Sequence, residues 1–102
     1  MSVIVEFSIF PMDKGESLSP YVARALKTIQ NSGLAYELNP MGTCVEGEWS
    51  EVMALVDRCF QELEKDCNRI SLSLKADYRK GPPGRMRGKI ESVKEKLETS
   101  QQ

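Results

Sequence analysis

The sequence contains no histidine, and this absence narrows the chemistry open to the protein. Histidine is the commonest general base near neutral pH and the commonest protein ligand of transition metals. Catalysis by other residues stays possible, but many of the usual enzyme mechanisms and metal sites are removed. We therefore expect a protein that is not an enzyme, with no catalytic residues, no metal site and no cofactor.

Cysteines and long apolar runs are also scarce. The three cysteines, Cys44, Cys59 and Cys67, are odd in number and irregularly spaced, which argues against a disulfide framework and fits a reducing compartment. No apolar run approaches the ~20 residues that span a bilayer. Residues 1–10 lack the basic region and the long apolar stretch of a signal peptide. We expect a cytoplasmic protein without membrane contact.

The 102 residues are enough for a single domain, 1–102, with a modest core. Residues 1–68 carry five basic and eleven acidic side chains, whereas residues 69–102 carry nine basic and four acidic ones. The basic part has no interleaved aromatic residue except Tyr78, so we expect no binding of nucleic acid. The opposite charges instead predict attraction within the chain or between subunits.

Hydrophobic periodicity predicts four strands. Each shows alternation of apolar and polar residues or an excess of β-branched residues. The predicted strands are Val3–Phe10, Leu34–Leu38, Thr43–Gly47 and Arg69–Tyr78. The turn Asn39–Gly42 joins the second and third strands into a hairpin.

Three helices are predicted between and after these strands. The first has Ser19 as its N-cap and Pro20 at its first helical position, and it ends at Gly33. The second follows Gly47–Ser50. The third follows the loop Gly81–Gly84, and its predicted buried face consists of Met86, Ile90, Val93 and Leu97.

The resulting order is βαββαβ with an extra C-terminal helix. Two βαβ halves joined by a hairpin predict an α+β, ferredoxin-like sandwich: a four-stranded antiparallel sheet with both long helices on one face. Right-handed connections place the first and third strands in the centre of that sheet.

This fold leaves one sheet face uncovered by the two long helices. Alternation puts Glu6 and Ser8 of the first strand, and Cys44 and Glu46 of the third, on that face. With strands roughly 5 Å apart we expect Glu6, Ser8 and Glu46 to lie close together, with the Thr43 hydroxyl near the mouth of the site. A solvated polar face would explain the same pattern. The sharper hypothesis is a pocket for an amino-bearing or cationic ligand.

Two activities that occur on this architecture lack their motifs here. Copper carriers of this fold have two cysteines in a short loop before the first helix, whereas Cys44 lies on the third strand and Gly47 stands where a second thiolate would be needed. Acylphosphatases need an arginine-bearing phosphate cradle after the first strand. The segment Phe10–Gly15 offers only Lys14.

A distinctive pattern of residues runs through four segments of the chain. The segments are Glu6-Phe7-Ser8-Ile9-x-Pro11, Ser17-x-Ser19-x-Tyr21-Val22, Ser32-Gly33-Leu34-x-Tyr36 and Pro40-Met41-Gly42-Thr43-x-Val45-Glu46-Gly47. With them, the sequence resembles the small thiamine-binding protein family of the YkoF-like superfamily over nearly its whole length. The last segment is the most specific one.

The resemblance implies a ferredoxin-like fold and homotetramers assembled as dimers of dimers. It also implies non-enzymatic binding of thiamine (vitamin B1), or of its hydroxymethylpyrimidine part, in thiamine transport or salvage. It suggests ligand contacts for Thr43 and Glu46 first, and for Glu6 and Ser8 second. A structural or regulatory oligomer, whose polar sheet face serves only assembly, is the alternative.

Overall fold

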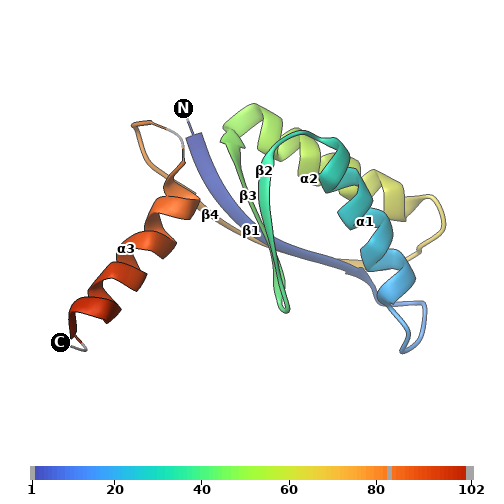
Figure 1. Ribbon diagram of the computed structural model, residues 1–102. Coiled ribbons are helices and arrows are strands. Elements are labelled where there is room, and N and C mark those ends of the chain that lie inside the picture. Colours follow the sequence, from blue (N-terminus) through green and yellow to red (C-terminus); the bar gives the residue numbers. More distant parts are fainter. Residues whose placement is uncertain (1, 83, 101–102) are drawn as a thin grey trace.

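The computed structural model describes residues 2–82 and 84–100, which form four strands and three helices (Figure 1). In chain order these are β1 (Ser2–Pro11), α1 (Ser19–Asn31), β2 (Ala35–Asn39), β3 (Gly42–Glu48), α2 (Trp49–Glu64), β4 (Ile70–Tyr78) and α3 (Arg85–Ser100). The loop predicted at Gly81–Gly84 joins β4 to α3, and Pro83 within it lies outside the described residues.

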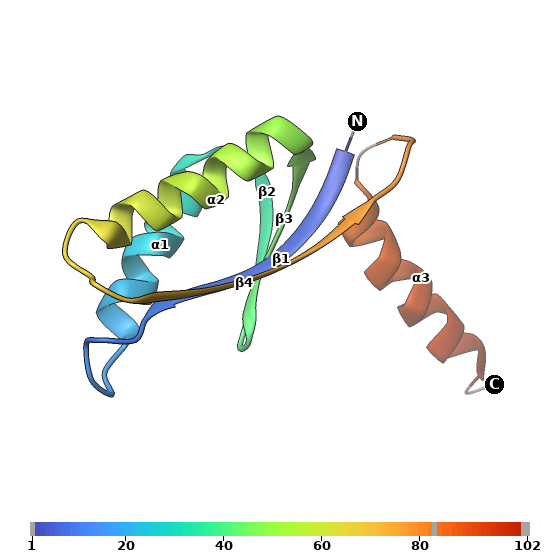
Figure 2. The same cartoon turned by 180° about the vertical axis from the view of Figure 1, so that it is seen from behind.

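The strands form one antiparallel sheet in the order β2-β3-β1-β4. The first and third strands are therefore central, as predicted. Helices α1 and α2 cover one face of the sheet, and α3 lies on the other side (Figures 1 and 2). This arrangement confirms the predicted α+β, ferredoxin-like fold with an added C-terminal helix. In the described part of the chain, no helix is long and apolar enough to cross a membrane.

The core lies between the sheet and the helix pair. Val3, Val5, Phe7 and Ile9 alternate along β1 and are all buried, because every second residue of a strand points to the same face. Both helices add apolar side chains to this layer; Ala25, Ile29, Val52, Leu55, Val56, Cys59 and Leu63 are buried. Cys59 is fully buried and therefore part of the core, and this burial raises the pKa of its thiol to about 11.

The start of α1 differs from the prediction. Ser19 is the first residue of the helix, Leu18 occupies the N-cap position, and no side chain caps this end. The backbone N–H groups of Tyr21 and Val22 both donate to the Leu18 carbonyl oxygen at 3.0 Å. The predicted Ser19 cap is therefore wrong by one position. At the other end, Gly33 has a φ of +78°, a conformation that glycine adopts without strain and that lets the chain turn into β2.

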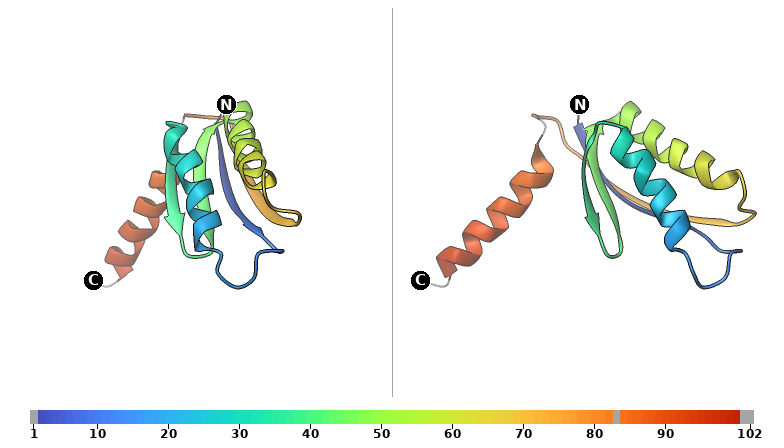
Figure 3. Two further views of the ribbon diagram at one scale, coloured as in Figure 1. Left: turned by 90° about the vertical axis from the view of Figure 1, so that its right-hand side faces the viewer. Right: turned by 45° about the vertical axis from the view of Figure 1, so that its right-hand side comes forward.

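The apolar stripe of α3 is exposed in the single chain, contrary to the prediction of a buried face. Ile90, Val93 and Leu97 all belong to the exposed large hydrophobic residues. The helix diverges from the sheet, so that its C-terminal end lies far from the other elements (Figure 3). The physical reason is that the start of α3 is hydrogen-bonded to Glu46 on the uncovered side of the sheet, which directs the helix away from α1 and α2.

Glu46 of β3 attaches the beginning of α3 to the sheet. The buried Glu46 carboxylate accepts hydrogen bonds from the backbone N–H groups of Gly84 at 3.2 Å and Arg85 at 2.9 Å. The Ser2 hydroxyl donates to the same carboxylate at 3.4 Å. A helix begins with N–H groups that have no partner within the helix, and a carboxylate also matches the positive end of the helix dipole. Glu46 therefore serves as the N-terminal cap of α3 from a distant strand.

Asp77 at the end of β4 gives α3 a second attachment. Its carboxylate pairs with Lys89 and lies 3.8 Å from the Arg85 guanidinium, which also donates to the Asp77 carbonyl oxygen at 3.1 Å. The Lys89 ammonium holds the pKa of the Asp77 carboxyl below its usual value. Both attachments involve the first turns of α3, which explains why only its N-terminal part stays near the sheet.

We predict that Glu46→Ala loosens α3 without unfolding the sheet. Removing a helix cap costs roughly 0.5–2 kcal/mol, so hydrogen-exchange protection of the α3 amides should fall by roughly three- to thirty-fold, while β1 and β3 amides keep theirs. Glu64→Ala, at an exposed position at the end of α2, is the matched control. Unchanged α3 protection in Glu46→Ala would show that the carboxylate does not anchor the helix.

Candidate functional site

Two hollows of the described structure lie on opposite faces of the sheet and bear on function. The first, which we name the helix-side pocket, lies between α1, β1 and the β2–β3 hairpin and has a volume of about 300 Å³. The second, the open-face groove, lies between the uncovered sheet face and α3 and measures about 600 Å³. The four residues predicted from the sequence are distributed between these two faces.

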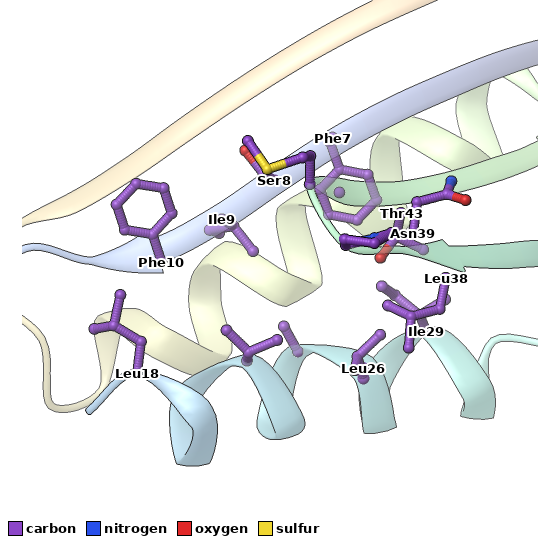
Figure 4. Close-up of a pocket in the computed structure, with 15 residues that line it drawn as sticks. Phe7, Ser8, Ile9, Phe10, Leu18, Leu26, Ile29, Leu38, Asn39 and Thr43 are labelled. Atoms are coloured by element: carbon purple, nitrogen blue, oxygen red, sulfur yellow. The ribbon is translucent and has the colours of Figure 1, made fainter. Parts of the chain in front are cut away.

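The helix-side pocket is mostly apolar. Its lining comes from β1, from α1 with the residue before it, and from the hairpin: 7–10, Leu18, Val22, Ala25, Leu26, Ile29 and 38–43. Phe10 and Leu18 lie at one end, whereas Phe7, Asn39 and Thr43 lie at the other (Figure 4). An apolar hollow with a few polar groups at one end is the usual form of a small-molecule site.

Thr43 supplies a hydroxyl to the polar end of this pocket. It is paired with Phe7 across the sheet and is only 6% exposed. Directly opposite residues of paired strands point to the same face, so the Thr43 side chain lies on the helix side. The Thr43 hydroxyl has no hydrogen-bond partner among the described residues, so it can donate to a ligand and accept from one.

The edge of β1 is a second polar feature of the pocket. β1 pairs with β3 only as far as Phe7, while 8–11 continue and pair with β4 alone. The Phe7 carbonyl oxygen faces Gly42 so closely that a Cβ there would lie 3.0 Å from it. Since alternate peptide groups of a strand point to the same side, the N–H and C=O of Ile9 point toward the unpaired edge. They offer one donor and one acceptor beside the apolar lining.

The open-face groove is charged rather than apolar. Its walls include three carboxylates from the sheet, Glu6, Glu37 and Asp77, and the two lysines Lys75 and Lys89. The Cys44 thiol also lines this groove, with its Sγ 3.9 Å from a carboxylate oxygen of Glu6. Burial, and then the charges of Glu6 and Glu37, raise the pKa of this thiol, so Cys44 stays protonated at neutral pH.

The structure does not bring the four predicted residues into one site. Thr43 points into the helix-side pocket, whereas Glu6 lies in the open-face groove and Glu46 caps α3. Glu46 is paired with Ile4 and Ser8 with Ser73, which separates Ser8 from the Glu46 position by roughly 13 Å along β1. The expectation that Ser8 and Glu46 are near neighbours is therefore wrong.

Ser8 is the one predicted residue that borders both faces. It lines the helix-side pocket and also a smaller hollow on the open face, beside Glu6 and Ser73. Glu6 is a diagonal neighbour of Glu46, because its direct partner on β3 is Cys44. The predicted assignment of Glu6, Ser8, Cys44 and Glu46 to one strand face agrees with this register.

Sequence reasoning missed the peptide edge at Ile9, the hydrogen bond that the Asn39 amide donates to Cys44 on the open face at 3.5 Å, and the capping role of Glu46. The cap had a signal: the segment before α3 reads Gly81-Pro82-Pro83-Gly84 and offers no serine, threonine, aspartate or asparagine to cap the helix. A helix without a local cap needs an acceptor from elsewhere. The free edge of β1 had no such signal in the sequence, because it depends on how long β1 is relative to β3.

A metal site receives no support from the geometry. Among the described residues there is no group of three or more cysteine, aspartate or glutamate side chains that could hold a metal ion. Cys44, Cys59 and Cys67 are all unpaired. The expectations of no metal, no cofactor and no catalytic residues stay predictions.

Comparison with known proteins places the chain in a family. A protein from Mycobacterium bovis named UPF0045 protein is 36% identical over 98 residues, which cover 95% of this chain and 96% of that protein. The crystal structure of a hypothetical protein from Methanocaldococcus jannaschii is 33% identical, covers 92% of this chain and 97% of that one, and superposes with a TM-score of 0.84.

A second solved structure carries a functional suggestion. It is a protein from Thermotoga maritima for which a role in thiamine biosynthesis or salvage has been suggested; it is 33% identical, covers 78% of this chain and 85% of that one, and gives a TM-score of 0.71. The sequence profile described as thiamine-binding protein matches residues 5–94, which include most of β1, the hairpin and the whole lining of the helix-side pocket. The chain belongs to the thiamine-binding protein family.

Proposed function

We propose that this protein binds thiamine, or its hydroxymethylpyrimidine part, in the helix-side pocket and acts in thiamine transport or salvage without turnover of the ligand. The observation that carries the proposal is the polar end of an otherwise apolar pocket, formed by the Thr43 hydroxyl and the free edge of β1 at Ile9. Membership of the thiamine-binding protein family supports the choice of ligand.

The chemistry of an aminopyrimidine fits this pocket. The ring is flat and apolar on its faces, and it carries an amino donor beside ring nitrogens that accept hydrogen bonds. The Ile9 carbonyl oxygen could receive the amino group, while the Ile9 N–H or the Thr43 hydroxyl could donate to a ring nitrogen. Phe7, Leu26 and Ile29 supply the apolar contacts. A backbone edge fixed by the sheet is a rigid recognition element, as a specific site requires.

The size of the pocket bears on which part of the vitamin it holds. A volume of about 300 Å³ lies at the lower end of the usual range for ligand pockets, ~300–1,000 Å³. It suits one substituted ring better than the whole two-ring vitamin. The cationic thiazolium would then lie toward the mouth, outside the apolar lining, where water continues to solvate its charge.

This proposal gives the four candidate residues different roles. Thr43 and the Ser8 segment of β1 contact the ligand, whereas Glu46 holds α3 and Glu6 lies across the sheet. The rival arrangement places the ligand in the open-face groove, where the carboxylates of Glu6 and Glu37 would attract a cation. A single set of variants separates the two.

Calorimetric titration with thiamine and with hydroxymethylpyrimidine tests the proposal. Thr43→Val should weaken binding about five-fold, since a neutral hydrogen bond contributes about 1 kcal/mol. Val22→Trp should weaken it at least roughly ten-fold, because the indole would fill the pocket that Val22 lines. Ala23→Trp, at the next and exposed position of α1, is the matched control and should keep the wild-type affinity.

Glu6→Gln decides between the two faces, because Glu6 lines the open-face groove and no part of the helix-side pocket. Glu46→Gln accompanies it, since its amide oxygen can still accept a hydrogen bond from the start of α3. On our proposal both variants bind like the wild type. A loss of affinity in either variant, together with unchanged affinity in Thr43→Val, would move the site to the open face. Absence of binding by the wild type would favour the structural or regulatory oligomer.

We further propose that the protein is a cytoplasmic homotetramer, assembled as a dimer of dimers. A small domain with exposed apolar side chains on several elements, β4 and α3 among them, gains stability from burying them between copies. Three unpaired cysteines suit a reducing compartment. Sedimentation equilibrium at micromolar concentration should give about four chains per particle. A monomer under these conditions would contradict this part of the proposal.

A further inference from the structure

The outer strand β4 carries an apolar strip that the helices of the described structure leave partly uncovered. Leu72 and Leu74 of β4 are paired with the buried Ile9 and Phe7, so they point to the face that α1 and α2 occupy. Yet Leu72 is 43% and Leu74 is 42% exposed. The cause is the position of α2, which packs on β1 and β3 more than on β4.

The C-terminal helix carries a second apolar surface. Met86, Ile90 and Val93 follow one another at spacings of four and three, which places them on one side of α3. Ile90 is 38% and Val93 is 58% exposed. Met86 and Ile90 border the open-face groove of their own chain, and beyond them the helix runs away from the sheet (Figure 3).

These two surfaces cannot meet within one chain. The strip on β4 faces the side of α1 and α2, whereas α3 leaves from the other side and is held there by Glu46 and Asp77 (Figure 2). An amphipathic helix needs an apolar partner for its stripe, and an exposed apolar strip on a sheet is typical of an interaction surface. A second copy of the chain offers both surfaces in the required form.

Charge favours this match between copies. A helix lying on the β4 strip would be a neighbour of α2, because α2 covers the adjoining part of the same face (Figure 2). Within Trp49–Glu64, α2 has four acidic residues and one basic residue, whereas α3 has five basic and three acidic ones. Opposite potentials across a contact favour the correct orientation of the two partners.

We propose that α3 of one copy docks on the β4 strip of a second copy, with Ile90 and Val93 packed against the partner's Leu72 and the partner's Leu74. In a two-fold dimer the contact occurs twice, since each chain gives its helix and receives the other. The helix-side pocket takes no part in this contact. Ligand binding and helix docking can therefore fail independently of each other.

Two single variants test the two halves of the contact. Leu74→Glu places a charge on the strip and Val93→Glu places one on the helix. Each should give smaller particles in sedimentation velocity, with the concentration for half assembly raised at least roughly thirty-fold, as for a central interface residue. Ala23→Glu, at an exposed position of α1, should assemble like the wild type. The milder pair Leu74→Ser and Val93→Ser serves if a glutamate variant does not fold.

Mixing the two variants identifies the pairing. The Leu74→Glu chain keeps an intact helix, and the Val93→Glu chain keeps an intact strip, so one good contact forms only in the mixture. An equimolar mixture should therefore regain larger particles that neither variant forms alone. Wild-type assembly in either single variant, or no recovery in the mixture, would overturn the proposal; the latter would indicate strip-to-strip or helix-to-helix pairing. Titration with thiamine on the same variants reports the pocket separately.

Discussion

The register between β1 and its two neighbours is the constraint on which the rest of the structure depends. Val5 pairs with Val45 on one side and with Ala76 on the other, and this sets which residues of these three strands share a face. A shift of one residue would exchange the faces of a whole strand, moving Thr43 out of the helix-side pocket and Glu46 away from α3. The pocket, the anchor of α3 and the apolar strip on β4 all follow from this one alignment.

Much of the fold could be predicted because it rests on local patterns. The alternation in β1 and β4, the glycine after α1 and the two apolar helices indicate a βαββαβ order without any knowledge of contacts. The same alternation also argues against a single site that contains both Thr43 and Glu46. Thr43 and Glu46 are three residues apart on one strand, and an odd separation places two side chains on opposite faces.

The parts that sequence could not supply depend on relations between distant elements. Nothing local to α3 says that Glu46 of β3 holds its first turn on the uncovered side of the sheet, so its stripe was expected to be buried. Nothing within β1 says that its pairing with β3 stops at Phe7. The free peptide edge beyond Phe7 exists because β1 extends further than β3 does. The N-cap of α1 was missed because a one-residue shift at a helix end lies within the usual variation of helix boundaries.

The two faces of this small sheet have separate roles. Its helix side is apolar and holds the pocket, while its other side is charged and holds the attachment of α3. Residues on one strand can therefore contribute to different tasks without contact between their side chains. Val45 illustrates this separation, because it is fully buried in the core between Cys44 and Glu46, which face the opposite side.

The β2–β3 hairpin forms one wall of the pocket, but it lies at the edge of the sheet, and its turn at Pro40 and Met41 is exposed. Lengthening a flexible loop costs little, about 0.6 kcal/mol for each doubling. Insertions or exchanges at this turn would reshape the entrance while β1, α1 and the core stay as they are. Descendants of this scaffold could thus acquire new ligands through changes at an exposed turn that supplies no residue to the buried core.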